Sequence, residues 1–442
     1  MSNGLIVNGG FKLHGDFEIQ GSKNESFGVI CAALLTNDDV IINNVPDIVD
    51  FYSLLKIFDL LCVDVAKLDC NKYKFNASNV KKLDDVNINI FRSCLQSLRG
   101  GILVMGPLLA RFGNAIIPIP GGDKIGRRRL DTHFLGIQKL GVEYSYDSNI
   151  QAYVCKSRNK KLQGNYILLD ESSVTGTANI ILASVLADGT TTIYNAACEP
   201  HIQQLCKMLN NMGAKISGIG SNMLIIDGVD KLHGVEHNIE SDIIEIGSMI
   251  GLAAMTESDL TLKCSNLQPL SLGPVLSRFR KLGIKIDVEG TNVHIPSQHT
   301  YEIESELNPS SIVRIDDAIW PGFPTDLLCV LLVTAIQAKG SVLIHEKMFE
   351  SRLFFVDNLI EMGAKIILCD PHRAHVIGIN REYNLHSIGV NSPDIRTGMS
   401  LLIAALSADG KSKIGNLNII KRGYQDIVNR LLKIGAHVEE IN

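Results

Sequence analysis

The chain has 442 residues, of which 45% are hydrophobic and 20% are charged, a composition typical of a globular protein with two or more domains. Its formal net charge of −5 argues against a nucleic-acid-binding protein, because such proteins usually carry a basic excess. The first residues lack the pattern of a signal peptide, and the apolar run Leu327–Ile336 is too short to cross a bilayer, so we expect a cytoplasmic protein without a membrane partner. Ten scattered cysteines without a Cys-x-x-Cys pair favour neither a disulfide framework nor a metal site.

Six apolar helices are expected at similar intervals along the chain. Each begins after a small or polar residue and is apolar on nearly every side, so each should be buried. The expected ranges are Asn24–Leu35, Ile102–Arg111, Gly176–Leu186, Ser248–Met255, Asp326–Ala338 and Gly398–Ser407.

A second signature alternates with these helices. An amphipathic helix ends in an apolar residue and a glycine, which is typical of a left-handed helix C-cap, and a strand follows at once. The six marks are Gly141, Gly213, Gly283, Gly363, Gly435 and a degenerate copy at Cys62. Two signatures repeated six times predict six similar units, arranged as two globular halves of three units each.

The segment 120–133 concentrates more chemistry than any other stretch. Gly121, Gly122 and Gly126 allow positive φ and movement, while residues 127–129 are three consecutive arginines suited to phosphate and carboxylate. Asp123 lies at the expected loop tip. We interpret the segment as a mobile loop that closes over a phosphorylated substrate. A solvated basic turn is the alternative for these residues taken alone.

These features resemble the enolpyruvyl transferases, and within that family the members whose acceptor is UDP-N-acetylglucosamine. The resemblance covers essentially the whole chain. Besides the loop, the motifs that carry it are Gly21-Ser22-Lys23-Asn24, Leu98-Arg99, Gly106-Pro107-Leu108-Leu109-Ala110-Arg111-Phe112-Gly113, Ser173-Val174-Thr175-Gly176-Thr177, Phe323-Pro324-Thr325-Asp326, Phe349-Glu350-Ser351-Arg352, Asp394-Ile395-Arg396 and Arg422-Gly423-Tyr424.

The resemblance implies an α/β fold, a two-domain inside-out α/β barrel in which each domain has three βαβαββ repeats with buried helices. The active-site cleft would lie between the domains. One domain would span residues 23–240 and carry the catalytic loop. The other would combine residues 1–22 with 241–442 and carry the base and an arginine clamp.

The implied activity is transfer of the enolpyruvyl group of phosphoenolpyruvate to the 3-hydroxyl of UDP-N-acetylglucosamine with release of phosphate, the first committed step of peptidoglycan precursor synthesis. Both partners are small molecules, and no metal or organic cofactor is expected. Three alternatives stay open at this point: an enolpyruvyl transferase for another nucleotide sugar, a catalytically silent paralogue that binds UDP-sugars, and an interaction scaffold.

Two polyanionic substrates require several cations, and arginine suits them because its fork binds phosphate and carboxylate bidentately. By resemblance, phosphoenolpyruvate would be bound by Lys23, Asn24, Arg128, Arg352, Arg396 and Arg422. The nucleotide sugar would be bound by Arg99, Arg128, Arg129, Leu130, Asp131, Thr132, Ser172, Ser173, Val174, Thr175, Asp326 and Met348. Glu171 stands where the family often has lysine, and Arg129 replaces a proline beside the uracil.

Two proton transfers assign the catalytic residues. Asp326 matches the family carboxylate that takes the proton of the sugar hydroxyl, although a carboxylate at a helix N-terminus also has a purely structural explanation. Asp123 would donate the proton to C3 of phosphoenolpyruvate. The family usually has cysteine here, and aspartate excludes a thioether adduct and predicts resistance to fosfomycin. A free aspartate has a pKa of about 3.9, so this role requires the closed loop or the substrate anions to keep Asp123 protonated.

Overall fold

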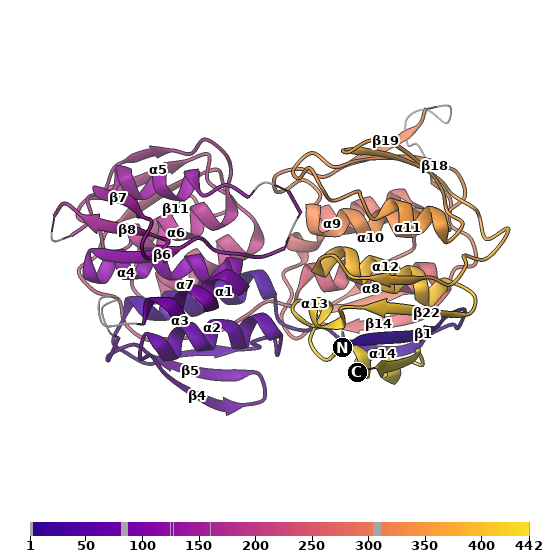
Figure 1. The fold of residues 1–442 in the computed structure, drawn as a ribbon, viewed down its shortest axis with the longest axis horizontal. Helices are drawn as coiled ribbons and strands as arrows, with labels where there is room; N and C mark the ends of the chain where they lie inside the picture. Colours follow the sequence, from indigo (N-terminus) through magenta and orange to yellow (C-terminus); the bar gives the residue numbers. More distant parts are fainter. Residues whose placement is uncertain are drawn as a thin grey trace. The chain divides into compact units, whose positions relative to one another are not determined.

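The computed structural model describes residues 3–80, 87–123, 125–126, 128–159, 161–303 and 311–441. They form two compact units (Figure 1). Unit 1 contains Met1–Gln20, Asp123–Arg127 and Glu240–Asn442, and unit 2 contains Gly21–Gly122 and Arg128–Ile239. The described strands form six sheets, three in each unit, and each unit has its own hydrophobic core.

Unit 2 has two four-stranded sheets and one three-stranded sheet. In spatial order, the first consists of β13 (Val235–Asn238), β3 (Val40–Asn43), β5 (Lys72–Asn76) and β4 (Asp64–Asp69). The second consists of β6 (Asn114–Pro118), β8 (Ala152–Ser157) and β7 (Val142–Asp147). The third consists of β11 (Lys215–Ser217), β12 (Met223–Asp227), β10 (Thr190–Tyr194) and β9 (Tyr166–Leu168).

The helices of unit 2 supply its core. They are α1 (Lys23–Ala32), α2 (Val49–Leu60), α3 (Ile88–Ser97), α4 (Met105–Phe112), α5 (Asp131–Lys139), α6 (Val174–Ser184) and α7 (Pro200–Asn211), with 3-10 turns at Ala33–Leu35 and Arg99–Val104. Helix α1 packs against α7, and α6 packs against α4 and α5. All residues of α1 except Asn24 are buried, and so is α6 from Gly176 to its end, as the apolar pattern predicted.

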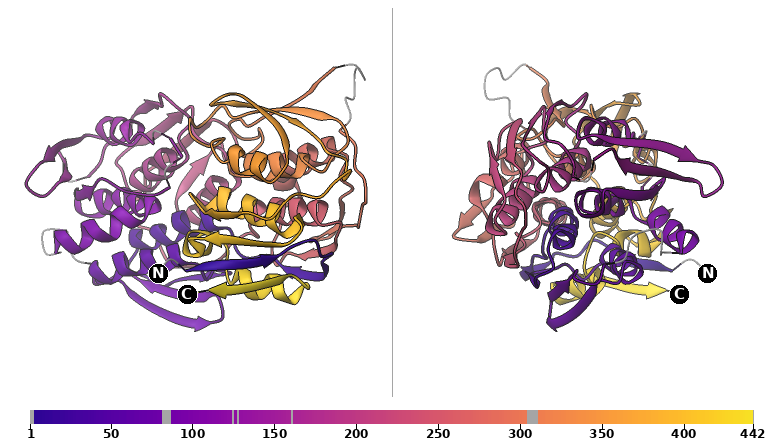
Figure 2. Two further views of the ribbon diagram at one scale, coloured as in Figure 1. Left: turned by 45° about the vertical axis from the view of Figure 1, so that its right-hand side comes forward. Right: turned by 90° about the vertical axis from the view of Figure 1, so that its left-hand side faces the viewer.

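Unit 1 has three four-stranded sheets. The first consists of β21 (Gly389–Asn391), β22 (Lys411–Gly415), β1 (Gly4–Asn8) and β23 (His437–Ile441). The second consists of β15 (Asp287–Glu289), β16 (Asn292–Ile295), β14 (Asp259–Lys263) and β2 (His14–Glu18). The third consists of β17 (Val313–Asp316), β18 (Ser341–His345), β20 (Arg373–Ile377) and β19 (Lys365–Asp370). The N-terminal strand β1 lies between β22 and β23 of the C-terminal segment (Figure 2).

The helices of unit 1 are α8 (Ile243–Met255), α9 (Pro269–Lys281), α10 (Thr325–Ala335), α11 (Val356–Glu361), α12 (Ile395–Ser407), α13 (Leu417–Lys421) and α14 (Ile427–Lys433). Helices α8, α10 and α12 pack against one another. In Figure 1 they lie between β18 and β19 on one side and β1 and β14 on the other, so the helices are inside and the sheets outside. No helix in the described ranges is both long enough and apolar enough to cross a membrane.

The repeat is clearest in β17–α10–β18–α11–β19–β20, a complete βαβαββ unit. Three repeats obtain a strand from elsewhere in the sequence, and one of these strands is β1, which pairs with β22 and β23. Strand β2 pairs in parallel with β14, and β13 pairs in parallel with β3. Strand β2 therefore completes a sheet built mainly from residues 259–295, in agreement with the chain passing from unit 1 to unit 2 and back.

The predicted helix ends are confirmed. The five marked glycines have φ between 86° and 100°, and Cys62, the degenerate copy, has φ 56°. One helix expectation was wrong. Residues 102–111 do not form a single helix, because a 3-10 turn over Arg99–Val104 precedes α4. Pro107 lies in the first turn of α4, where its missing N–H has no helical partner to lose.

Candidate functional site

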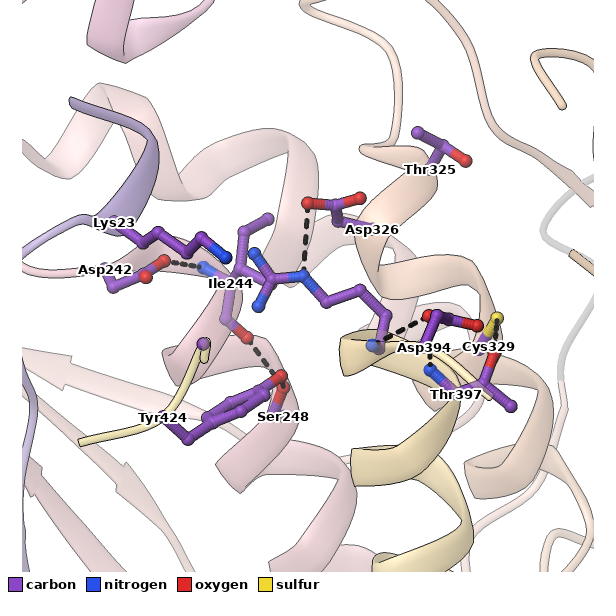
Figure 3. A network of polar contacts seen from close by, with 12 residues as sticks. Lys23, Asp242, Ile244, Ser248, Thr325, Asp326, Cys329, Asp394, Thr397 and Tyr424 are labelled. Atoms are coloured by element: carbon purple, nitrogen blue, oxygen red, sulfur yellow. Dashed lines mark hydrogen bonds and ion pairs between the residues drawn. The ribbon is translucent and has the colours of Figure 1, made fainter. Parts of the chain in front are cut away.

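In unit 1, two buried arginines hold the carboxylate of Asp326. Arg352 Nη2 donates to Asp326 Oδ1 at 2.6 Å, and Arg396 Nε donates to Oδ2 at 3.2 Å. Asp326 lies in the first turn of α10 and Arg396 in the first turn of α12, so two packed helices bring them together. Figure 3 shows Asp326 at the start of its helix, with Asp394 and Thr397 close to each other. The structure thus joins three residues that the sequence placed in the reaction.

The backbone fixes Arg396 by a capped helix start. Asp394 is the N-cap of α12, and its side chain accepts from the backbone N–H groups of Arg396 and Thr397 at 2.9 and 3.1 Å. The Arg396 guanidinium also lies 5.6 Å from the ring centroid of Tyr424, whose hydroxyl is 2.9 Å from Ser248 Oγ (Figure 3). These contacts leave the guanidinium few alternative positions.

Arg352 and Arg396 are only 3% and 5% exposed. Burial lowers the pKa of each guanidinium, but the negative charge of Asp326 and other neighbouring groups outweighs burial, and the pKa of both is raised. Within the described part of the chain, no acceptor reaches Arg352 Nε, Arg352 Nη1 or Arg396 Nη1. Buried N–H groups of a charged side chain are costly without partners. This cluster is therefore suited to bind an anion.

Asp123, the expected acid, forms an ion pair in unit 1. Arg422 Nη1 lies 2.6 Å from Asp123 Oδ1, and both side chains are about one fifth exposed, at 21% and 19%. In this arrangement the Asp123 carboxylate is bound to Arg422, a residue that we expect to bind phosphoenolpyruvate. Lys124 and Arg127, which belong to the predicted mobile loop, lie outside the described residues.

In unit 2, Lys23 begins α1 and pairs with a buried acid. Its Nζ lies 2.7 Å from Asp50 Oδ2, and the two residues are 8% and 3% exposed. Ser22 caps this helix by accepting from Glu25 N. Asn24 is exposed at the same helix start. Asp50 was not anticipated, because the sequence around it carries no motif.

Arg99 forms hydrogen bonds with the backbone at the arginine-rich end of the loop. Its Nη2 donates to the carbonyl oxygens of Arg128 and Arg129 at 2.9 and 3.1 Å. Burial, and then the charge of Arg128, lower the pKa of Arg99 to about 10. A Cβ on Gly121 would lie 1.7 Å from the Gln96 carbonyl oxygen, so only glycine fits beside this helix end.

The remaining predicted nucleotide residues lie around the starts of α5 and α6. Thr132 Oγ1 donates to Asp170 Oδ1 at 2.8 Å, and Ser173 caps α6 by accepting from Gly176 N. Ser172 Oγ is buried without a hydrogen-bond partner in the described ranges. The other predicted residues here are Arg129 and Asp131, which pair with each other, Leu130, which precedes α5, and Val174 and Thr175 in the first turn of α6. In unit 1, Met348 is 38% exposed.

His133 connects these two helix starts and had no predicted role, although it lies in the quoted loop motif. It is fully buried, with Nε2 3.1 Å from Thr175 Oγ1 and Nδ1 3.0 Å from Asn179 Nδ2. Burial, and then the charge of Arg99, lower the pKa of His133 to about 3. The ring is therefore neutral at physiological pH, and it accepts from the Asn179 amide.

The described residues contain no group of three or more His, Cys, Asp or Glu side chains arranged to hold a metal ion. What they contain is a set of cations and carboxylates. Unit 1 supplies Asp123, Asp326 and three arginines. Unit 2 supplies Lys23, Arg99, Arg128 and the N-termini of α5 and α6, of which α6 is capped by Ser173. Such groups can bind phosphate and carboxylate anions and exchange protons with them.

Known proteins are similar to this chain in sequence and in fold. Residues 7–431 match the family of EPSP synthase (3-phosphoshikimate 1-carboxyvinyltransferase). The chain is 55% identical over 437 residues to the UDP-N-acetylglucosamine 1-carboxyvinyltransferase of Bacteroides thetaiotaomicron, and 53% identical over 436 residues to the protein of that name from Porphyromonas gingivalis, with 99% of each chain covered.

Two solved structures have the same fold at low identity. The enolpyruvyl transferase NikO from Streptomyces tendae has a TM-score of 0.86 with 21% identity over 99% of both chains. EPSP synthase from Acinetobacter baumannii has a TM-score of 0.72 with 16% identity over the full length of both. These similarities confirm the expected two-domain inside-out α/β fold.

Proposed function

Because the chain belongs to the UDP-N-acetylglucosamine 1-carboxyvinyltransferase family, we propose that it transfers the enolpyruvyl group of phosphoenolpyruvate to the 3-hydroxyl of UDP-N-acetylglucosamine. Phosphate is released, and the product enters peptidoglycan precursor synthesis. We place the reaction in the cytoplasm. The observation that carries the proposal is the cluster of Asp326 with Arg352 and Arg396, whose buried N–H groups lack acceptors among the described residues.

The anionic groups of phosphoenolpyruvate would bind to arginine and lysine side chains. Arg352 and Arg396 offer three buried nitrogen atoms without an acceptor among the described residues, and Arg422 becomes available when it leaves Asp123. By the family resemblance, Lys23 and Arg128 would be further cations for this substrate, and Asn24 would contribute its side-chain amide. Each cation that binds a phosphate or carboxylate oxygen neutralises negative charge of phosphoenolpyruvate, which would otherwise repel the second anionic substrate.

The nucleotide sugar would bind chiefly to unit 2. The N-termini of α5 and α6 present backbone N–H groups that suit the diphosphate, and Arg99, Arg129 and the segments 130–132 and 172–175 surround them. Met348 of unit 1 would contact the nucleotide. The Arg129 guanidinium is planar and can stack on a base, as the family's proline does by packing.

The chemistry needs a base and an acid. Asp326 takes the proton of the 3-hydroxyl as its oxygen bonds to C2 of phosphoenolpyruvate. Asp123 gives a proton to C3, which becomes a methyl group. When phosphate leaves C2, a proton leaves the same methyl carbon, and the C2–C3 double bond forms again. The two arginines on Asp326 orient its carboxylate for the first transfer.

Asp123 needs a change of partner before it can act as an acid. In the structure it is paired with Arg422 at 2.6 Å. A substrate anion that binds Arg422 would release Asp123 and would favour its protonated form by placing negative charge nearby. Binding and acid activation would therefore occur in one step.

Phosphate release measured with both substrates tests the proposal. We expect release only when phosphoenolpyruvate and UDP-N-acetylglucosamine are present together, and not with phosphoenolpyruvate alone. UDP-glucose and UDP-N-acetylgalactosamine serve as matched acceptor controls. Release that is faster with another nucleotide sugar would refute the assigned acceptor.

The pairing of Asp123 with Arg422 also favours a second candidate, a catalytically silent protein that binds UDP-sugars. Such a protein would bind UDP-N-acetylglucosamine in calorimetry yet release no phosphate under any condition. The two functions are therefore separated by the same pair of measurements.

A further inference from the structure

Two buried carboxyl groups lie side by side at the ends of neighbouring parallel strands in unit 1. Strands β17 and β18 are in register, with Asp316 opposite His345. The residue that directly follows each strand is an acid, Asp317 after β17 and Glu346 after β18, and both are fully buried. Parallel strands end at the same edge of a sheet, so this register brings the two acids together. Neither acid had a role predicted from the sequence.

The Glu346 carboxylate collects hydrogen bonds from two functional segments. Thr325 Oγ1 donates to Glu346 Oε2 at 3.0 Å, and Thr325 directly precedes the expected base Asp326 at the start of α10. The backbone N–H groups of Met348 and Phe349 donate to Glu346 Oε1 at 3.0 and 2.9 Å. One side chain therefore ties the base's helix to the segment that carries Met348.

The segment that begins with Met348 and Phe349 continues to Arg352, which binds the expected base Asp326. The Arg352 guanidinium lies 5.4 Å from the ring centroid of Phe349, while its Nη2 donates to Asp326. The contacts of Glu346 and of Arg352 thus act on Asp326 from two directions. Figure 3 shows Thr325 and Asp326 as neighbours at the helix start.

Asp317 follows β17 and is the acid whose charge acts most directly on Glu346. Asp317 Oδ1 accepts from Lys347 N at 2.6 Å, whereas Oδ2 is buried and no N–H or hydroxyl group of the described ranges donates to it. Burial, and then the hydrogen bond with Asp317 and its charge, raise the pKa of Glu346 to about 8. Negative charge on a buried neighbouring carboxyl disfavours ionisation of Glu346, which is why its pKa is raised.

We infer that Glu346 is a positioning residue for the transfer reaction, because its hydrogen bonds hold Thr325 and the Met348 segment in the places from which Asp326 and Met348 act. The inference rests on the proposed function. It assigns two separable effects. The link through Thr325 governs the orientation of the base, and the link to the Met348 and Phe349 N–H groups governs the nucleotide contact.

Thr325→Val tests the first link, because it replaces the hydroxyl with a methyl group of similar size. We expect kcat to fall about tenfold, since small displacements of a catalytic group are costly, while KM for UDP-N-acetylglucosamine stays within twofold. Thr325→Ser keeps the donor and should restore most of the rate. Thr334→Val is the matched control, because Thr334 is a buried threonine of the same helix whose hydroxyl donates to Val330 O.

Glu346→Leu and Glu346→Gln test the second link. The leucine variant removes the acceptor for both N–H groups, and we expect a lower kcat together with a KM for UDP-N-acetylglucosamine raised at least fivefold. Glutamine keeps an acceptor and can donate to Asp317, so it should recover both parameters to within about threefold. If Glu346→Leu fails to fold, as circular dichroism and urea unfolding would reveal, Thr325→Val still decides the question.

The inference is overturned if Thr325→Val turns over like the wild type, or if Thr325→Ser is as impaired as Thr325→Val. It is also overturned if Glu346→Gln is as impaired as Glu346→Leu. A wild-type protein without phosphate release would instead refute the proposed function. The two failures are therefore distinguishable within one set of assays.

Discussion

Replacing Asp123 with asparagine should separate catalysis from substrate binding. The change removes the acid and also removes the negative charge that occupies Arg422 at 2.6 Å. Loss of a general acid typically lowers kcat by about 10²–10⁴-fold. The ion pair, with both side chains about one fifth exposed, contributes on the order of 1 kcal/mol after allowance for solvent screening. Phosphoenolpyruvate no longer has to displace it, so its Kd should fall about fivefold.

Two assays measure these effects on Asp123→Asn. Phosphate release at saturating substrates gives kcat, and calorimetry with phosphoenolpyruvate in the presence of UDP-N-acetylglucosamine gives the Kd. Asp370→Asn is the matched control, because Asp370 pairs with Arg373 on β19 and β20 of the same unit without a predicted role. We expect the control to change neither value. Turnover of Asp123→Asn at the wild-type rate would refute the assignment of Asp123 as the acid.

Three further outcomes are expected. Asp123→Cys should keep activity and gain inactivation by fosfomycin, because a thiolate attacks the epoxide far faster than a carboxylate does; persistent activity after prolonged exposure would contradict this. Cys62→Gly should raise the free energy of unfolding by up to about 1 kcal/mol in urea titration, because Cys62 has φ 56° at a helix end where the other repeats have glycine. His133, whose pKa is lowered to about 3, stays neutral in the folded protein, whereas the unfolded chain binds a proton below pH about 6.5. Folding stability should therefore fall as pH drops from about 6.5 towards 3, by up to roughly 1.4 kcal/mol per unit, and His133→Gln should flatten this part of the curve; an unchanged slope would count against a buried neutral ring.

Local rules explain why the repeat could be predicted from the sequence. The residue that ends each of these helices, such as Gly141 or Gly363, has a positive φ. Glycine adopts this conformation most easily, so it marks the helix end without any knowledge of the fold. Cys62 shows that the spacing of the repeat predicts the conformation even where glycine is missing. The buried helices were predicted by their apolar residues on every side. Two of these helices begin two to three residues before their expected starts, because Asp394 and Ser173 act as N-caps there.

The candidate site could be predicted by residue type and motif but not by partner. Asp326 and Arg396 are 70 residues apart, and Asp123 and Arg422 are 299 apart, so no local pattern links them. The pair of Asp317 with Glu346 depends on the register of two parallel strands. A change of register by one residue would separate the two acids, and single residues in a sequence do not specify register.

The identity of the product tests the central claim most directly. Purified protein incubated with phosphoenolpyruvate and UDP-N-acetylglucosamine should release one phosphate for each new nucleotide sugar formed. Mass spectrometry and NMR should then show an enolpyruvyl ether on the 3-oxygen of the N-acetylglucosamine. An unmodified nucleotide sugar, or an enolpyruvyl group at any other oxygen, would contradict the proposed function.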